Sequence, residues 1–137
     1  MATRRPQAVR EFLAHAREDR RPMIEAIDAT IRSSAPELRT GFDGKFLGYG
    51  PFHYRYASGR EGDTFVVGMM DGVQALSVYV TGGDGGQYLV ESNAKRLGRV
   101  SVGKVCIRVR KLEHIDLGVL GELVRTAADQ HAGDLTA

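Results

Sequence analysis

The most informative stretch of the sequence is Leu97-Gly-Arg-Val-Ser-Val-Gly-Lys-Val-Cys-Ile-Arg-Val-Arg110. Its first half, from Gly98 to Lys104, matches the opening of a phosphate-binding P-loop, which continues with Ser or Thr and leads from a strand into a helix. Here Val105 follows the lysine, and residues 105–109 alternate apolar and polar side chains. Such alternation is typical of a half-buried strand. The stretch therefore predicts a turn and a strand, and it argues against nucleotide hydrolysis.

Upstream segments show the same alternation. It predicts strands at residues 52–56, 64–69 and 74–81. Asp71-Gly72 lies between the last two and is a strong hairpin signal, so we expect these strands to be antiparallel. Residues 39–49 place glycines between aromatic and aliphatic residues, and they fit either a bent strand or a structured loop.

Helical patterns flank the strands. Apolar residues recur at helical spacing in residues 7–20 and from Pro22 to Ser34. We expect a short helix from Asp84 to Leu97 and a last helix that Asp116 caps and Gly133 ends. This order predicts an α+β fold with a mainly antiparallel sheet, packed on one face by the N-terminal and C-terminal helices. We expect one domain over residues 1–133 and a frayed tail at 134–137.

The composition limits the possible partners. The chain has 137 residues and a formal net charge of +2, which predicts no binding to nucleic acid. No apolar run approaches the ~18 residues of a membrane-spanning helix, which predicts no membrane partner. The one cysteine, Cys106, cannot form an internal disulfide and fits a reducing compartment. Because the N-terminus also lacks an apolar leader, we expect a cytoplasmic protein.

Three blocks in the sequence resemble the YdhG-like family, known as domain of unknown function 1801. They are Leu47-Gly-Tyr-Gly-Pro-Phe-His-Tyr-Arg-Tyr-Ala-Ser-Gly-Arg-Glu-Gly-Asp63, Leu76-Ser-Val-Tyr-Val80, and residues 97–108 with 112–116. The resemblance covers about residues 23–128 and implies a small cytosolic α+β protein whose relatives mostly have no assigned function. The chain departs from the family at Phe46-Leu-Gly-Tyr-Gly-Pro51, where many members have a Trp-Gly-Met-Pro-like segment. It also has Gly72-Val-Gln74 where many members carry a lysine.

Some relatives carry a frataxin-like iron-chaperone label, which is one alternative function. Weak iron delivery by hard ligands favours a ridge of carboxylates. The first helix and its continuation instead carry many arginines among their acidic residues: Arg10, Arg17, Arg20 and Arg21 against Glu11, Glu18 and Asp19. The sequence therefore gives the iron role little support.

A candidate site follows from strand geometry. Side chains alternate between the two faces of a strand, so apolar residues facing the helices leave polar ones on the reverse. If these polar sets are neighbours, they form a cationic surface for a phosphate or carboxylate. The candidate ligand-binding residues are His53, Tyr54, Arg60, Tyr79, Lys104 and Arg108. The alternatives are an ordinary solvated sheet face and an interface between two copies of the chain.

Two residues keep an enzymatic alternative open. Cys106 is either a nucleophile, with its pKa lowered by a neighbouring cation, or a small packing residue. His53 is a possible general base or ligand. The four histidines share no metal-ligand spacing, so we expect no metal site, and nothing in the sequence indicates a cofactor. We therefore expect a non-catalytic binding module for a small anionic ligand or a partner protein.

Overall fold

The sheet has six strands in the order β1-β2-β3-β4-β8-β7, and every neighbouring pair is antiparallel. The computed structural model describes residues 5–135, apart from the side chain of Asp84. The strands of this sheet are β1 Thr40–Phe42, β2 Phe46–Arg55, β3 Glu61–Asp71, β4 Leu76–Val80, β7 Ser101–Val102 and β8 Cys106–Val109. A separate two-stranded hairpin joins β5, Gly83–Asp84, to β6, Gln87–Tyr88.

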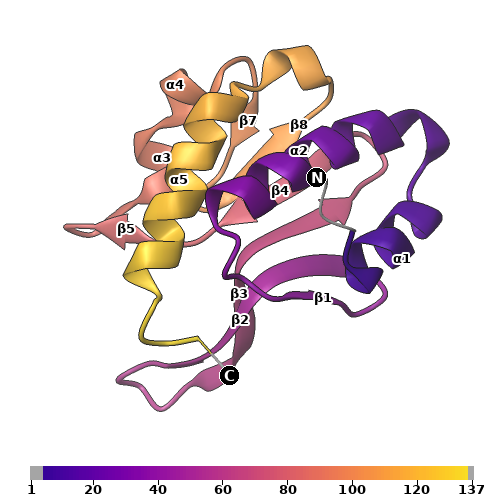
Figure 1. Ribbon diagram of the computed structural model, residues 1–137. Coiled ribbons are helices and arrows are strands. Elements are labelled where there is room, and N and C mark those ends of the chain that lie inside the picture. The colour runs from indigo at the N-terminus through magenta and orange to yellow at the C-terminus, as the bar shows by residue number, and fades with distance from the viewer. Residues whose placement is uncertain (1–4, 136–137) are drawn as a thin grey trace.

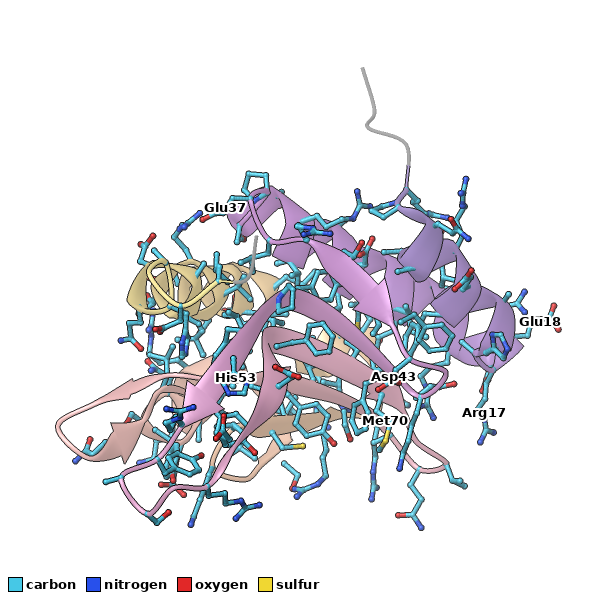
Figure 2. The ribbon with its side chains drawn as sticks, turned by 90° about the horizontal axis from the view of Figure 1, so that it is seen from below. Arg17, Glu18, Glu37, Asp43, His53 and Met70 are labelled. Atoms are coloured by element: carbon cyan, nitrogen blue, oxygen red, sulfur yellow. The ribbon has the colours of Figure 1, made fainter. Side chains whose placement is uncertain are left out.

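The helices come from both ends of the chain and from the segment between β6 and β7. They are α1 Gln7–His15, α2 Arg21–Ser34, α3 Leu89–Ser92, α4 Ala94–Leu97 and α5 Leu117–Gln130, with 3-10 turns η1 Glu18–Arg20 and η2 Leu112–His114. Figure 1 shows α2 and α5 side by side across the strands, and in Figure 2 the long helices lie along one side of the sheet. The predicted α+β class and the packing of terminal helices on one face are confirmed.

The core lies between the sheet and these helices. Every second residue of β4 and β8 is fully buried there: Leu76, Val78, Val80, Ile107 and Val109. They face the apolar stripes of α2 and α5, which bury Ile24, Ile27, Ile31, Leu120 and Val124. The alternate residues of the same strands face the opposite side, which we call the open face. The predicted division of these strands into two faces is confirmed.

The alternation in β2 shifts by one residue at Gly50. Tyr49 faces the helices, because its hydroxyl reaches α2, and Phe52 also faces them, because its ring stacks on His131 at 4.5 Å. An odd spacing between residues on one face requires an irregular residue between them. Gly50 has φ +73, and a Cβ there would lie 2.7 Å from Leu38, so the position requires glycine. Past this point, His53 lies on the open face.

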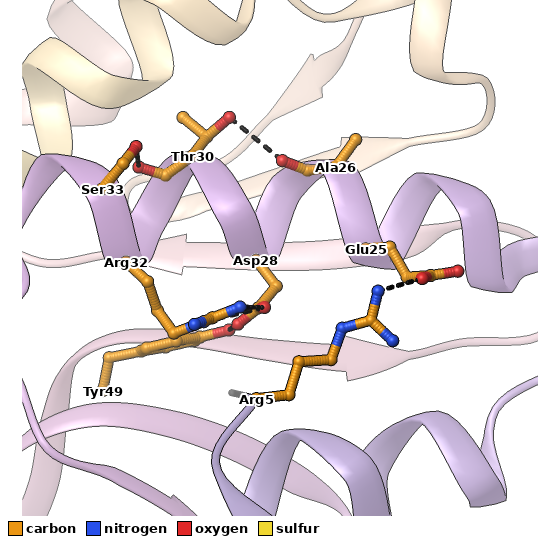
Figure 3. A network of polar contacts seen from close by, with 8 residues as sticks. All are labelled: Arg5, Glu25, Ala26, Asp28, Thr30, Arg32, Ser33 and Tyr49. Carbon is orange, nitrogen blue, oxygen red and sulfur yellow. Dashed lines mark hydrogen bonds and ion pairs between the residues drawn. The ribbon is translucent and has the colours of Figure 1, made fainter. Parts of the chain in front are cut away.

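A buried polar network ties β2 to α2 (Figure 3). The Tyr49 hydroxyl donates to Oδ1 of Asp28 at 2.7 Å, and both side chains belong to fully buried residues. Arg32 donates from Nε and Nη2 to the other carboxylate oxygen at 2.9 and 2.8 Å. A buried carboxylate is tolerated only when its oxygens are paired. Burial and the negative charge of Asp28 raise the pKa of Tyr49 well above its ordinary value, so its hydroxyl stays protonated and donates.

Two segments differ from the sequence predictions. The first helix ends at His15, and Asp71 on the β3–β4 turn accepts a hydrogen bond from the Arg17 N–H at 2.9 Å, as the chain turns into η1. The glycine-rich connection at 82–86 is part of the β5–β6 hairpin, and the helix expected from Asp84 begins at Leu89. In the predicted tail, Leu135 forms a bridge to Phe52; residues 136–137 lie outside the described part of the chain.

Candidate anion site

A basic hollow opens beside the open face, at the β4–β8–β7 side of the sheet. Its volume is about 600 Å³. The side chains that give it hydrogen-bonding capacity and charge are Ser77, Arg99, Ser101, Arg108, Arg110 and His114. Gly72, Gln74, Ala75 and Val100 complete the lining. We call this site the basic hollow.

Strand register places the centre of the basic hollow. Arg108 on β8 pairs with Ser77 on β4 and with Ser101 on β7. Cross-strand partners point to the same face, so the arginine stands between two hydroxyls. Arg108 donates from Nη1 to the Ser101 Oγ at 3.2 Å, which holds the guanidinium over the sheet. Its other donors remain free for a ligand oxygen.

Gly98 brings Arg99 and His114 together from distant parts of the chain. The Arg99 N–H donates to the His114 carbonyl oxygen at 2.8 Å, and the Asp116 N–H donates to the Leu97 carbonyl oxygen at 2.8 Å. Gly98 has φ +110, and a Cβ there would lie only 2.3 Å from the His114 carbonyl oxygen. The glycine that resembles the start of a P-loop is thus needed for a close backbone approach. The strand that follows it confirms the rejection of the P-loop.

The β3–β4 turn, which forms one rim of the basic hollow, is fixed by an ion pair with η1. Arg20 donates to Asp71 Oδ1 at 2.8 Å and to the Gly72 carbonyl oxygen at 3.0 Å. The side chains of Arg20 and Asp71 are 9% and 11% exposed, so this ion pair is shielded from solvent. A shielded pair with several hydrogen bonds restrains its turn more firmly than a surface pair does. The ion pair therefore fixes the position of Gly72 and Ala75 at the edge of the hollow.

The charges of the basic hollow are not compensated nearby. None of the ion pairs within residues 5–135 involves Arg99, Arg108 or Arg110. No Asp or Glu is among the described residues that line the hollow. Guanidinium groups bind carboxylate and phosphate oxygens through paired N–H donors. The basic hollow can therefore accept an anion without first breaking an ion pair.

The six predicted site residues do not form one site. Tyr79 and Arg108 share the open face on adjacent strands, where Tyr79 pairs with Cys106. The cross-strand partners of Arg108 on the open face are Ser77 on β4, then Met70 on β3, then Phe46 on β2. His53 lies seven residues further along β2 than Phe46, which is about 23 Å at ~3.3 Å per residue. Figure 2 shows His53 and Met70 at separate places on the sheet.

The other three predicted residues lie elsewhere. Tyr54 is on the helix side of β2, beside Tyr56 with ring centroids 5.1 Å apart. Arg60 is exposed in the turn before β3. Lys104 lies in the β7–β8 turn with its Nζ 5.7 Å from the centroid of the Tyr88 ring.

The imidazole of His53 lies between two carboxylates. Nδ1 lies 2.9 Å from Asp63 Oδ1, and Nε2 lies 2.8 Å from Glu61 Oε1. The hydrogen bonds from Asp63 and then Glu61 raise the pKa of His53, which favours the imidazolium. With both nitrogens engaged, His53 has no free lone pair for the base role that the enzymatic alternative gives it. Cys106 is half-buried beside Tyr79, whose pKa is raised first by its own burial.

Of the six arginine, serine and histidine residues that line the basic hollow, the predicted site contained only Arg108. Arg110 continues the alternation of β8, so the strand pattern alone was enough to add it to the site. Arg99 and His114 meet through the Gly98 bridge to Ile115, which no local pattern predicts. Among the side chains that the structure describes, no three His, Cys, Asp or Glu groups are placed to hold a metal ion. None of the described helices is long and apolar enough to cross a membrane.

Comparison with solved structures identifies the fold. A protein of the domain of unknown function 1801 family, YdhG from Bacillus subtilis, superposes with a TM-score of 0.66 at 16% sequence identity, covering 91% of each chain. The chain has a YdhG-like fold. No family model matches the sequence, and no curated protein does. At this identity the likeness confirms the expected architecture, and the function has to be inferred from the site itself.

Proposed function

We propose that the protein is a binding module for a small anion, such as a phosphate or carboxylate compound, held in the basic hollow. The observation that carries the proposal is the set of three arginines without ion-pair partners among the described residues, gathered with His114 and two serine hydroxyls around one hollow. Clustered cations repel one another, and an anion bound between them removes that repulsion.

The chemistry of the lining favours oxyanions. Arginine offers planar pairs of N–H donors that match two oxygens of a phosphate or carboxylate. The hydroxyls of Ser77 and Ser101 flank Arg108 and supply further donors. The hollow of about 600 Å³ falls in the range of small-molecule sites. Among the described residues no hydrogen bond joins His114 to the hydroxyl of Ser77 or Ser101, so the lining shows no paired base and nucleophile, and a binding role fits the site better than catalysis.

Calorimetric titration of the purified protein with inorganic phosphate and with citrate tests the proposal. We expect saturable binding of at least one of these probes, weakened about tenfold or more by Arg108→Gln, because charge-assisted hydrogen bonds contribute roughly 1.5–3 kcal/mol. Arg10→Gln is the matched control: it removes the same charge from the exposed surface of α1 and should leave binding unchanged.

The site is located by following backbone amide shifts during the same titration. We expect the largest shifts at Gly72, Ser101 and Arg110, which line the basic hollow. If neither probe binds, or if Arg10→Gln and Arg108→Gln weaken binding equally, the proposal is wrong. Equal weakening would mean that the anions respond only to overall charge.

A further inference from the structure

A second hollow, on the helix side of the sheet, has a different lining. It has a volume of about 700 Å³ and lies between the end of the β2–β3 hairpin and the β5–β6 hairpin, beside the last turn of α5. Figure 1 shows the two hairpins projecting on either side of the lower end of α5. Its aromatic lining residues are Phe52, Tyr54, Tyr56, Tyr88 and His131, and we call it the aromatic hollow.

The aromatic hollow exposes rings that a folded chain usually covers. In the described part of the chain, four large hydrophobic side chains are exposed, and two of them line this hollow: Tyr56 at 58% and Tyr88 at 40%. They come from different hairpins, so they can contact a ligand from two directions. Aromatic rings contribute large contact areas at low entropic cost, and a planar ligand stacks well on them.

The walls of the aromatic hollow are held in place. Phe52 stacks on His131 at 4.5 Å, and His131 lies within 3.2 Å of the Thr81 hydroxyl. The β5–β6 hairpin is tied to α5, because the Gly83 N–H donates to the Gln130 side-chain oxygen at 3.1 Å. A preformed site loses less entropy when it binds a ligand than a flexible one.

The glycines of the β5–β6 hairpin leave its backbone bare on the rim. A Cβ at Gly83 would lie 2.1 Å from the Gln87 carbonyl oxygen, so the hairpin closes only with glycine there. Gly85 and Gly86 have positive φ and open space at the Cβ position. A ligand can therefore approach the main chain closely and use its N–H and carbonyl groups.

Lys104 gives the mouth of the aromatic hollow a charge. Its Nζ lies 5.7 Å from the centroid of the Tyr88 ring, and none of the ion pairs among the described side chains, which do not include that of Asp84, involves it. A cation held beside a ring attracts a negatively charged group on a ligand stacked there and repels a cationic ligand. We propose that the aromatic hollow is a second ligand site, which takes a small molecule with a flat aromatic ring and a negative charge.

Two dyes of nearly the same shape test this proposal. Anilinonaphthalenesulfonate has a flat ring system and a negative charge, and phenylnaphthylamine is its uncharged analogue; both fluoresce on binding. We expect the anionic dye to bind saturably, and Tyr56→Ala and Tyr88→Ala each to weaken it at least about fivefold, from lost stacking. Lys104→Gln should weaken the anionic dye and leave the uncharged one unchanged.

Matched controls separate this site from general adsorption. Val73 is 82% exposed and lies outside the aromatic hollow, so Val73→Ala should change neither dye. Arg108→Gln tests the basic hollow and should leave dye binding intact. Amide shifts should concentrate at Gly82, Gly83, Gly85 and Gly86. All variants change exposed side chains, and thermal melting verifies that they fold.

Three outcomes would overturn the proposal: no saturable binding of the anionic dye, equal losses in Val73→Ala and Tyr88→Ala, or amide shifts spread over the whole sheet. Equal binding of the two dyes, unaffected by Lys104→Gln, would contradict the preference for an anion. Loss of dye binding on Arg108→Gln would contradict a second site and assign the dye to the basic hollow.

Discussion

Replacing Tyr49 by phenylalanine should destabilise the protein far more than the loss of one hydroxyl on the surface. The hydroxyl is the hydrogen-bond donor to Oδ1 of Asp28, and both residues are fully buried. Arg32 occupies the other carboxylate oxygen. After Tyr49→Phe, Oδ1 stays buried without a partner, because the phenylalanine ring keeps water out of the space.

The expected size follows from this geometry. A hydrogen bond to a charged group contributes roughly 1.5–3 kcal/mol, and a buried acceptor left unpaired loses it in full. We therefore expect Tyr49→Phe to lower the free energy of unfolding by about 2 kcal/mol. For a chain of this size that corresponds to a fall in Tm of about 6–10 °C. Tyr56→Phe is the control, because Tyr56 is 58% exposed and its hydroxyl can bond to water.

A double-mutant cycle isolates the contact. Asp28→Leu alone leaves the Tyr49 hydroxyl buried without an acceptor and separates Arg32 from its carboxylate, so we expect a large loss of stability, about 3–5 kcal/mol. Combining Asp28→Leu with Tyr49→Phe removes both partners. The double variant should lose about 2 kcal/mol less free energy of unfolding than the two single variants lose together. Urea unfolding at neutral pH measures all four proteins. Additive losses, or a Tm of Tyr49→Phe within about 1 °C of the parent, would refute the reasoning.

Alkaline pH gives an independent check. Burial, followed by the charge of Asp28, raises the pKa of Tyr49 in the folded state above its unfolded value near 10. A raised pKa contributes stability that is present below the unfolded pKa and is lost as the pH rises through the folded pKa. The parent should therefore lose stability above pH ~10, where Tyr49 of the unfolded chain ionises. The difference in free energy of unfolding between the parent and Tyr49→Phe should become smaller there.

Three further predictions concern the rest of the sheet. Gly98→Ala should lower the free energy of unfolding by about 2 kcal/mol or more in urea titrations, because its Cβ would meet the His114 carbonyl oxygen at a positive φ; Gly133→Ala, with open space around it, should not. The imidazole of His53 should titrate above its ordinary pKa in NMR spectra, and Asp63→Asn should lower that pKa. The stability that the ion pairs of His53 contribute is fully present below pH ~6.5 and is lost as the pH rises through the raised pKa. A measured His53 pKa at or below ~6.5 would contradict the prediction. Asp71→Ala should cost about 3 kcal/mol by leaving a buried arginine unpaired, and a loss under about 1 kcal/mol would show that solvent replaces the ion pair.

The fold could be predicted where its determinants are local. The hairpin at Asp71-Gly72 and the two faces of β4 and β8 follow from turn chemistry and period-two alternation, which neighbouring residues decide. The expected α-helical continuation to Arg20 was wrong because Asp71, more than fifty positions away, accepts a hydrogen bond from the Arg17 N–H. The β5–β6 hairpin was missed because its glycines carry no side-chain pattern.

The candidate site shows the same division between local and distant determinants. Period-two geometry assigns Tyr79 and Arg108 to one face, and the structure agrees. The period-two pattern gives no information on the register, that is, on how far one strand is shifted along its neighbour. The observed register places His53 far from Arg108. At Gly50 the residues of β2 that face the helices also change from odd to even positions, which a strict period of two does not predict. The grouping of the six residues into one site required a register that the sequence does not contain.

The basic hollow gathers three positive charges without a carboxylate among its described lining residues. Arg99, Arg108 and Arg110 are exposed, so solvent screens much of their mutual repulsion and an anion entering the hollow can contact them directly. Arg55, Arg96 and Arg125 have nearby carboxylates, whereas exposed Arg10, Arg21, Arg39 and Arg60 take part in none of the ion pairs of the described residues. Groups that lower stability and have no structural partner are common at binding sites, where the ligand supplies the missing charge. Arg99, Arg108 and Arg110 differ from the other unpaired arginines because all three line one hollow with two serines and a histidine, and this convergence supports an anion site more strongly than the number of positive charges does.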